Sequence, residues 1–286
     1  MTTAPAEQAP ATMLDRVSSL LEAFDGTRRL TLAELARKAN LPRSSTHRIL
    51  QRLVDMGWVE RHGFEYGLGM RIFELGSLVV RGDGIHRASL PIMHELHRRT
   101  GLTVHLSVLR GADVLHIERV GGWPQNTDGW QVGARQPAHH TAPGRALLAR
   151  LDPAERPAPD LSVPPTAYSL RTHAQYEREL YKVSDHGVAV DMQGLVLGIA
   201  SVATVVGPSG RSPAALSLTG PAASLRTGDL VAHLRIAAAD IWDAVTGVPR
   251  VGARRRPNGL PRGPRTGPAS GPAAPRPRTP EPARQA

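Results

Sequence analysis

The stretch from Leu32 to Leu68 reads LAELARKANLPRSSTHRILQRLVDMGWVERHGFEYGL and predicts two short helices, a tight turn between them and a hairpin after them. In the first helix, the apolar residues fall on one helical face: Leu32, Leu35, Ala36 and Ala39. Asn40 tolerates the left-handed conformation that ends a helix. Pro42 suits the start of the second helix, whose free N–H groups we expect Ser44 and Ser45 to cap.

The second helix has two chemically distinct faces. Its predicted core face consists of Ile49, Leu50, Leu53, Val54 and Met56. Its opposite face carries donor-rich side chains: Arg43, Ser44, Ser45, His47, Arg48, Gln51 and Arg52. Side chains of this kind suit base edges and phosphates in a major groove, so we expect a DNA-binding helix here. We expect a base contact from at least one of Arg43, His47 and Arg48; the alternative is that they contact phosphates only.

A hairpin is predicted directly after this helix pair. Its first arm is Trp58–Arg61, its second arm is Phe64–Leu68 with apolar residues at alternate positions, and Gly63 permits the turn. We expect Arg61 and His62 at the tip, in reach of phosphate or the minor groove. Helix, turn, helix and hairpin in this order predict a winged helix-turn-helix domain over residues 11–69.

The formal charge of +10 is concentrated at the end of the chain. From Val248 onward nine arginines stand against one acid, Glu281, which leaves only +2 for everything before them. Ten of the 25 prolines also lie there, so we expect residues 248–286 to form a disordered basic tail. This tail either raises non-specific DNA affinity or is an inert extension; we favour the first.

Several classes of function are disfavoured by composition and motifs. The chain has no cysteine, which excludes disulfides and thiolate chemistry and fits a reducing cytoplasm. It has neither an apolar run long enough for a membrane span nor a secretory signal, so we expect a cytoplasmic protein. Two histidine pairs, His94 with His97 and His139 with His140, lack a third ligand, and we interpret them as solvated rather than metal-binding. Without a nucleotide-binding or nucleophile motif, we expect no enzyme activity, catalytic residue or cofactor.

The rest of the chain predicts helices and strands in alternation. Residues 1–10 are expected to be disordered, and 13–24 to form a helix over the winged core. A linker helix is predicted over 70–83, and another helix over 85–99, interrupted or started near Pro91. The later elements are strands at 102–109 and 114–120 around a turn at 110–113, helices at 146–150, 176–185 and 230–245, and strands at 187–191, 198–206 and 214–218. Residues 84–247 therefore predict an α+β sensor-type domain.

The residues from Leu14 to Gly76, including LAELARKANLPRSSTHRILQRLVDMGWVER and YGLGMRIFELG, resemble the DNA-binding half of the IclR-type bacterial transcription factors. The second half resembles them too, through TGLTVHLSVLRGADVLHIERV, VGARQPAHHTAPGRALLA and AALSLTGP in the same order. The resemblance covers about residues 12–247. It implies a GAF-like effector domain around a small-molecule pocket, and homodimers or homotetramers acting on palindromic operators.

The resemblance also implies a set of effector-binding residues. It points to the loop from His139 to Gly144, where a helix start would offer free N–H groups to a carboxylate. The implied effector-binding residues are His140, Gly144, Asp191, Ser217, Thr219, Trp123 and Trp130. The alternatives are that the tryptophans only pack and that Gly144 only permits a tight turn.

Two departures from the family pattern bear on the ligand. Met192 to Leu195 replace an acidic stretch, and Ala200 stands where we place the family's cysteine, so we expect a less acidic and more apolar pocket. The implied ligand is an organic acid or an aromatic metabolite. We expect a ligand-responsive, sequence-specific regulator, a repressor rather than an activator. The competing interpretations are a non-specific or architectural DNA-binding protein driven by the tail and, less favoured, an enzyme using the second domain.

Overall fold

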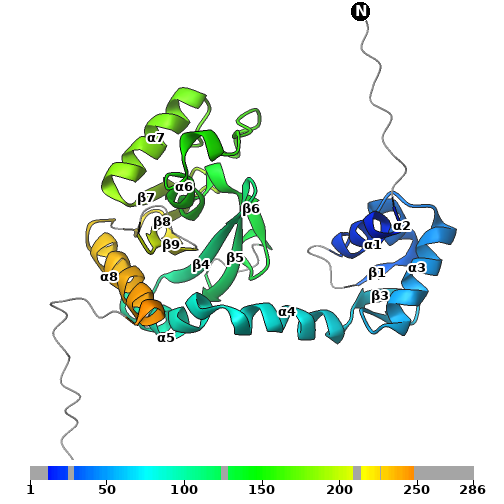
Figure 1. The fold of residues 1–286 in the computed structure, drawn as a ribbon. Helices are drawn as coiled ribbons and strands as arrows, with labels where there is room; N and C mark the ends of the chain where they lie inside the picture. Colours follow the sequence, from blue (N-terminus) through cyan, green and yellow to red (C-terminus); the bar gives the residue numbers. More distant parts are fainter. Residues whose placement is uncertain (1–11, 25–28, 124–127, 209–213, 226, 248–286) are drawn as a thin grey trace, which may run out of the picture. The chain divides into compact units, whose positions relative to one another are not determined.

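The computed structural model describes residues 12–24, 29–123, 128–208, 214–225 and 227–247 (Figure 1). The predictions of disorder for residues 1–10 and 248–286 lie outside these residues. An N-terminal helical domain with a small sheet is followed by helix α4 and by a second domain built on a larger sheet. Among the described helices, none combines the length and the apolar character that spanning a membrane requires.

The N-terminal domain is a winged helix-turn-helix, as the sequence predicted. Its helices are α1 (Met13–Glu22), α2 (Leu32–Lys38) and α3 (Arg43–Asp55). Its antiparallel sheet has the order β1-β3-β2, with β2 at Val59–His62 and β3 at Glu65–Leu68. Strand β1 (Leu30–Thr31) was not predicted, because two residues are too short to show a strand period. The three helices and the sheet enclose a core that includes Leu20, Leu35, Leu50 and Tyr66.

Local signals explain how this domain places α3. Thr31 accepts a hydrogen bond from the backbone of Glu34, whose side chain accepts in return from the Thr31 backbone, which forms a capping box for α2. Asn40 has a φ of +51°, the left-handed conformation expected of it. The turn brings Leu41 N–H to the carbonyl of Ala36, so α3 starts immediately after the turn.

Two helices connect this domain to the larger sheet. Helix α4 (Met70–Gly82) contains no buried residue in the described chain. Helix α5 (Gly84–Thr100) begins at Asp83, whose side chain accepts hydrogen bonds from two first-turn N–H groups. The predicted break near Pro91 is wrong, because α5 runs through this residue. The proline is exposed, and the packing of Met93 and Leu96 into the core holds the helix together although the proline has no N–H to donate.

The second domain is built on a six-stranded antiparallel sheet in the order β6-β5-β4-β9-β8-β7. The hairpin of β4 (Thr103–Arg110) and β5 (Asp113–Val120) and the strands β7 (Ala189–Met192), β8 (Ile199–Val206) and β9 (Ala214–Pro221) lie close to their predicted positions. Strand β6 (Arg135–Pro137) was not predicted, since its three residues form a strand only by pairing with β5. The predicted α+β class is therefore confirmed.

Helices cover both faces of this sheet (Figure 1). On one face, α5 and α8 (Thr227–Thr246) pack against side chains such as Leu106 and Leu218. On the other face, α6 (Ala142–Leu148) and α7 (His173–His186) cover Ala203 and Ala215. The short 3-10 helices η1 (Asp128–Trp130), η2 (Ala138–His140) and η3 (Pro153–Glu155) lie in the connections. The second face is not apolar throughout, and its polar part forms the site described below.

Candidate DNA-binding face and candidate effector pocket

The outward face of α3 presents the donor-rich side chains that the sequence placed there. Arg43, Ser44, His47, Arg48 and Arg52 are exposed, and Ser45 is half-buried. The opposite face packs into the domain core through Ile49, Leu50 and Leu53. Burial of the apolar face fixes the rotation of the helix, so the donor face is turned outward.

Two details of α3 differ from the sequence-based expectation. The residue that precedes the helix is Pro42, no side chain caps the first turn, and Ser44 and Ser45 lie inside the helix. They come too late to cap, because the capping residue must precede the first helical one. Met56 was assigned to the core but is 57% exposed, since the helix ends there and the chain turns away at Gly57, where φ is +72°.

The wing presents Arg61 and His62 at its exposed end, as predicted. Arg61 Nε donates to the carbonyl of Gly63 at 2.9 Å, and its guanidinium carbon lies 6.0 Å from the ring centre of Tyr66. His62 Nε2 is 3.4 Å from a carboxylate oxygen of Glu60. The wing therefore presents cationic and donor groups that are already oriented along the hairpin.

The predicted alternation of buried residues in the second arm is wrong apart from its middle. Tyr66 is buried, whereas Phe64 is 88% exposed and Leu68 is exposed as well. The hairpin meets the domain core only at its centre, so the residues two positions away on either side project past it.

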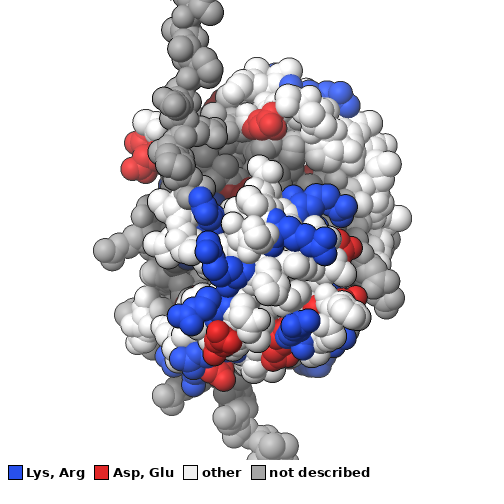
Figure 2. Space-filling model, turned by 90° about the vertical axis from the view of Figure 1, so that its right-hand side faces the viewer, with Lys and Arg blue, Asp and Glu red and all other residues white. Residues whose placement is uncertain are grey.

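Basic side chains gather over this domain (Figure 2). The view faces the side of the molecule on which Figure 1 has α3, and it shows groups of Lys and Arg side chains on a mainly uncharged surface, with a few acidic ones between them. Within α3 itself, Asp55 is the single acid, placed at the C-terminal end 4.0 Å from Arg52. The first two turns of α3 therefore carry the uncompensated positive charge.

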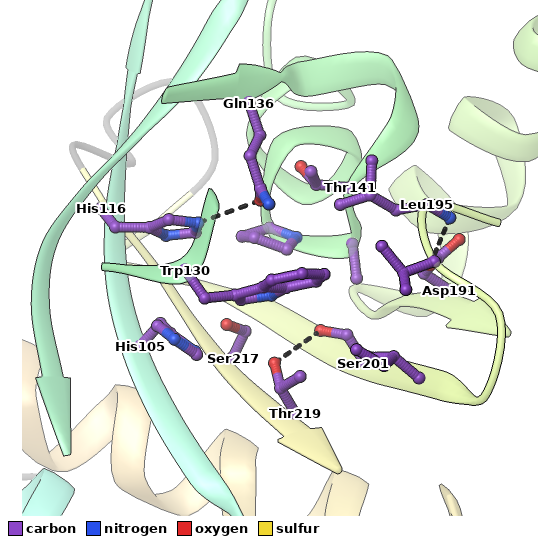
Figure 3. Close-up of a pocket in the computed structure, with 14 residues that line it drawn as sticks. His105, His116, Trp130, Gln136, Thr141, Asp191, Leu195, Ser201, Ser217 and Thr219 are labelled. Carbon is purple, nitrogen blue, oxygen red and sulfur yellow. Dashed lines mark hydrogen bonds between the residues drawn. The ribbon is translucent and has the colours of Figure 1, made fainter. Parts of the chain in front are cut away.

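A cavity lies between the polar part of the sheet and the start of α6 (Figure 3). Its lining comes from β4, β5, β6, β7, β8, β9, η1 and the first residues of α6. Four residues expected at the effector site, Trp130, Asp191, Ser217 and Thr219, line this cavity together. The remaining free volume is about 20 Å³.

The other three expected residues lie elsewhere. Trp123 is not among the residues that line the cavity, and its carbonyl accepts a hydrogen bond from the hydroxyl of Thr103. Gly144 does not line the cavity either. Its N–H donates to Thr141 Oγ1 at 3.0 Å and is therefore not free to bind a carboxylate. A Cβ on Gly144 would lie 2.2 Å from the carbonyl oxygen of Ala138, so this glycine permits the close approach of α6 to η2. His140 lines a neighbouring cavity.

That neighbouring cavity has a volume of about 420 Å³ and shares Asp191 with the first one. Between them lies a buried ion pair, with Arg145 Nη2 3.3 Å from Asp191 Oδ1. Arg145 also donates to the carbonyls of His139 and Val190. Sequence reasoning did not identify Arg145, because a basic residue in a short apolar helix has no partner until β7 is placed beside it.

Four polar side chains of the lining were missed: His105, His116, Gln136 and Ser201. Ser107 Oγ lies 2.8 Å from His116 Nδ1, and His116 Nε2 lies 3.1 Å from Gln136 Oε1. The signal was present in β4, where polar residues alternate with the buried apolar Val104, Leu106 and Val108. The assignment of Ala200 to a pocket position is corrected as well, because the next residue, Ser201, lines the cavity. Polar side chains from β4, β5, β6 and β8 therefore line the cavity, and the expectation of a pocket more apolar than is usual in the family stays a prediction.

Burial controls the charge of the histidines in this region. Desolvation lowers the pKa of His105 well below its usual value of about 6.5, and the nearby His116 and Arg119 lower it further. Desolvation also lowers the pKa of His116, with Arg119 adding to the effect and the bond to Gln136 opposing it. Both rings are therefore neutral at neutral pH.

The interpretation of the histidine pairs as solvated holds only for His94. His97 is half-buried and its Nδ1 lies 2.7 Å from the carbonyl of Leu102, while His139 and His140 are buried with ring centres 4.0 Å apart. In the described part of the chain, no three His, Asp or Glu side chains are grouped as metal ligands would be.

Comparison with known proteins identifies both domains. The family model for the IclR helix-turn-helix domain matches residues 13–63, and the model described as bacterial transcriptional regulator IclR C-terminal matches residues 78–242. The regulator XynR of Escherichia coli is 30% identical, over 72% of this chain and 84% of its own length. The acetate operon repressor of Salmonella typhimurium is 29% identical, over 72% and 77% respectively. These relatives are named as transcriptional regulators, not as enzymes.

Solved structures agree with this result. An IclR homolog from Microbacterium hydrocarbonoxydans, complexed with 4-hydroxybenzoate, superposes with a TM-score of 0.72 at 28% identity, covering 82% of this chain and all of the other. A transcriptional regulator from Rhodococcus superposes with a TM-score of 0.70, also at 28% identity, covering 82% and 98%.

Proposed function

Because this chain belongs to the IclR family of bacterial transcriptional regulators, we propose that it is a sequence-specific repressor that binds a palindromic operator and responds to a small molecule. The observation that carries this proposal is the exposed donor face of α3, which is rigidly supported by the domain core. One of the relatives, the acetate operon repressor, is named for repression. Binding to DNA places its site of action in the bacterial cytoplasm.

The DNA contacts are assigned by position on α3 and the wing. Arg48 and His47 occupy the middle of the exposed face, where they reach base edges when α3 enters the major groove. Arg43, Ser44 and Ser45 lie in an uncapped first turn, which suits a phosphate oxygen. Arg52 at the other end of α3, and Arg61 and His62 in the wing, contact the backbone and fix the register of the protein.

A dimer is supported by the surface of α4. Phe73 is 71% exposed and Val79 75% exposed, and Met70 and Leu78 are exposed as well. A helix that exposes this many large apolar side chains gains by packing against a second copy, since water is removed from both surfaces. A dimer, or a dimer of dimers, then presents two α3 helices to major grooves about one helical turn, ~34 Å, apart.

The effector site is assigned to the cavity that contains Trp130, Asp191, Ser217 and Thr219. A solved relative holds 4-hydroxybenzoate, which is both an organic acid and aromatic, so small molecules of these two classes are the proposed effectors. Such a ligand regulates only through a different affinity for the DNA-bound and the free arrangement of the dimer.

Selection of sheared genomic DNA by the full-length protein tests this function. At ~150 mM salt, where loose charge binding is suppressed, we expect a few enriched sites that share an inverted repeat. Arg48→Ala should reduce enrichment of these sites roughly 5- to 150-fold, the equivalent of about 1–3 kcal/mol for a base contact. Arg52→Ala is the matched comparison, because it removes an arginine that is assigned to the DNA backbone: it should weaken binding to all DNA to a similar degree and preserve the selection among sites.

Uniform recovery across the genome would favour the alternative function, a non-specific DNA-binding protein driven by the basic tail of nine arginines. Enrichment of the same sites by Arg48→Ala and the unmodified protein to the same degree would contradict the assigned contact.

A further inference from the structure

The indole of Trp130 occupies the space that the polar side chains of the effector cavity enclose. Figure 3 shows it between Gln136 and Thr141 on one side and His105 and Ser217 on the other. Trp130 is 7% exposed, and the free volume beside it is about 20 Å³. That space holds about one water molecule, so within this cavity an organic ligand fits only if it takes the place of the indole.

The surroundings of this indole are unusually polar for an aromatic side chain. His105 is fully buried, and neither of its ring nitrogens makes a hydrogen bond of ordinary geometry, although the backbone of Trp130 lies close to it. Nearby, Thr219 Oγ1 and Ser201 Oγ are 3.4 Å apart, a weak pairing. Buried polar groups are normally paired, so a buried histidine without a well-formed bond indicates a missing partner.

Trp130 lies where a hydrogen-bonding partner of His105 would be expected. The position of Trp130 is fixed by the close packing of the turn that carries it. A Cβ on the preceding Gly129 would lie 2.7 Å from Gln136 Nε2, so the backbone of this turn lies directly against the end of that side chain. Gln136 is in turn bonded to His116. The turn that carries the indole therefore rests directly on a side chain of the cavity, and a ligand that alters one alters the other.

The charge of the cavity restricts the ligand further. Among the described residues that line it there is no Lys or Arg, while the carboxylate of Asp191 does line it, with Arg145 bonded to that carboxylate from the neighbouring cavity. Arg119 lies opposite His105 in the β4–β5 ladder, outside the lining, and helps to keep that ring neutral. An anion in the cavity would meet a carboxylate and no lining cation.

Of the two effector classes proposed for this cavity, its charge favours the aromatic one over the organic acids. On the basis of that effector role, we propose that the ligand is an uncharged planar aromatic molecule with a hydroxyl group, which displaces the Trp130 indole and bonds to His105. A neutral imidazole has one donor and one acceptor nitrogen, so it accepts the hydroxyl proton in a hydrogen bond. The vacated site has the flat shape and the apolar faces of an indole, which suits one or two fused rings.

Calorimetric titration of the full-length protein with 2-naphthol tests this inference, with 2-naphthoate as the same ring system bearing a carboxylate. Trp130→Ala should bind 2-naphthol at least about tenfold more tightly than the unmodified protein, because it removes the internal competitor for the site. Trp123→Ala, the same change outside the cavity lining, should leave the affinity unchanged. Adding His105→Phe to Trp130→Ala should weaken 2-naphthol binding at least fivefold, and 2-naphthoate should bind more weakly than 2-naphthol throughout.

Three results would overturn the inference. Weaker binding of 2-naphthol to Trp130→Ala than to the unmodified protein would show that the indole contacts the ligand and does not compete with it. Tighter binding of 2-naphthoate than of 2-naphthol would contradict the argument from charge. Absence of binding to every variant would exclude this ligand class. Trp130→Leu, which fills more of the space, replaces Trp130→Ala if the latter loses its circular dichroism spectrum. Since titration is done without DNA, it is independent of genomic selection, and failure of the proposed regulator function would appear in that selection alone.

Discussion

The outward face of α3 and the cavity over the larger sheet are both rich in polar side chains, but they differ in their exposure to water. On α3, the arginines are exposed and keep their hydration until a partner replaces it. In the cavity, His105, Thr219 and Asp191 are buried and have lost that hydration already. The first surface therefore retains full charges at little cost, whereas the second is neutral or internally paired.

This difference indicates what each region recognises. Exposed cations attract the phosphate backbone at long range and independently of the DNA sequence. Specificity is added by the few side chains that reach the bases. Buried neutral groups attract nothing at long range and select a ligand by shape and by single hydrogen bonds. The same difference predicts that substitutions in the cavity change stability, and that substitutions on the outward face of α3 change DNA binding alone.

The largest expected effect tests the buried ion pair. Arg145→Met leaves the Asp191 carboxylate buried without its cation, and should lower the free energy of unfolding by about 3–5 kcal/mol, as measured by urea denaturation. Adding Asp191→Asn should recover part of the loss, because the uncompensated charge is then gone. Arg48→Ala is the exposed control and should change the same free energy by less than about 0.5 kcal/mol. Similar losses for the two arginine variants would remove the distinction between the regions.

A smaller effect concerns pH. Desolvation, followed by the effects of His139 and Arg145, lowers the pKa of His140 to about 4, against about 6.5 in an unfolded chain. Between these values the unfolded chain binds the proton and the folded one does not. The stability that this histidine contributes is therefore fully present above about pH 6.5 and is lost as the pH decreases towards about 4.

Denaturation curves measured between pH 7 and pH 4.5 check this expectation. His140→Gln, which cannot titrate, should show a shallower pH dependence than the unmodified protein. His94→Gln, a change of the same kind at an exposed position on α5, should keep the original dependence. An equal slope for His140→Gln and the unmodified protein would show that burial does not suppress the charge of His140.

The smallest effect is expected from the tail. Truncation before Val248 removes nine arginines and one glutamate and should leave folding unchanged. The plot of log affinity against log salt concentration should become less steep by about 0.9 for each phosphate that the shortened protein no longer neutralises, with the ratio of specific to non-specific affinity preserved. If truncation lowered the ratio of specific to non-specific affinity, the tail and not α3 alone would provide the specificity.

The exposed donor face of α3, proposed to bind DNA, was readable from the sequence because it is contiguous. The residues of α3 lie within a single helix, and a helical period separates buried from exposed positions without reference to the rest of the chain. The details that failed, the caps at Ser44 and Ser45 and the burial of Met56, concern the ends of this helix, where the period no longer applies.

The cavity was only partly readable, because it is assembled from distant segments. His105 and Ser217 are far apart in sequence and lie opposite each other because β4 pairs with β9, in a register that no local pattern specifies. Asp191, Ser217 and Thr219 were found through the family resemblance, which carries long-range information. His116 and Gln136 were missed, since their role depends on the pairing of β5 with the three-residue strand β6.

By itself, then, the sequence determined the winged helix-turn-helix, the outward face of α3 and the hairpin of β4 and β5, because each rests on the periodicity of a short segment. Only the tertiary structure decided that Arg145 neutralises Asp191, that His105 is buried without a well-formed hydrogen bond, and that an indole fills the cavity beside it. These properties depend on which strands are neighbours and on how much water their packing excludes, and both are set by interactions between residues far apart in the chain.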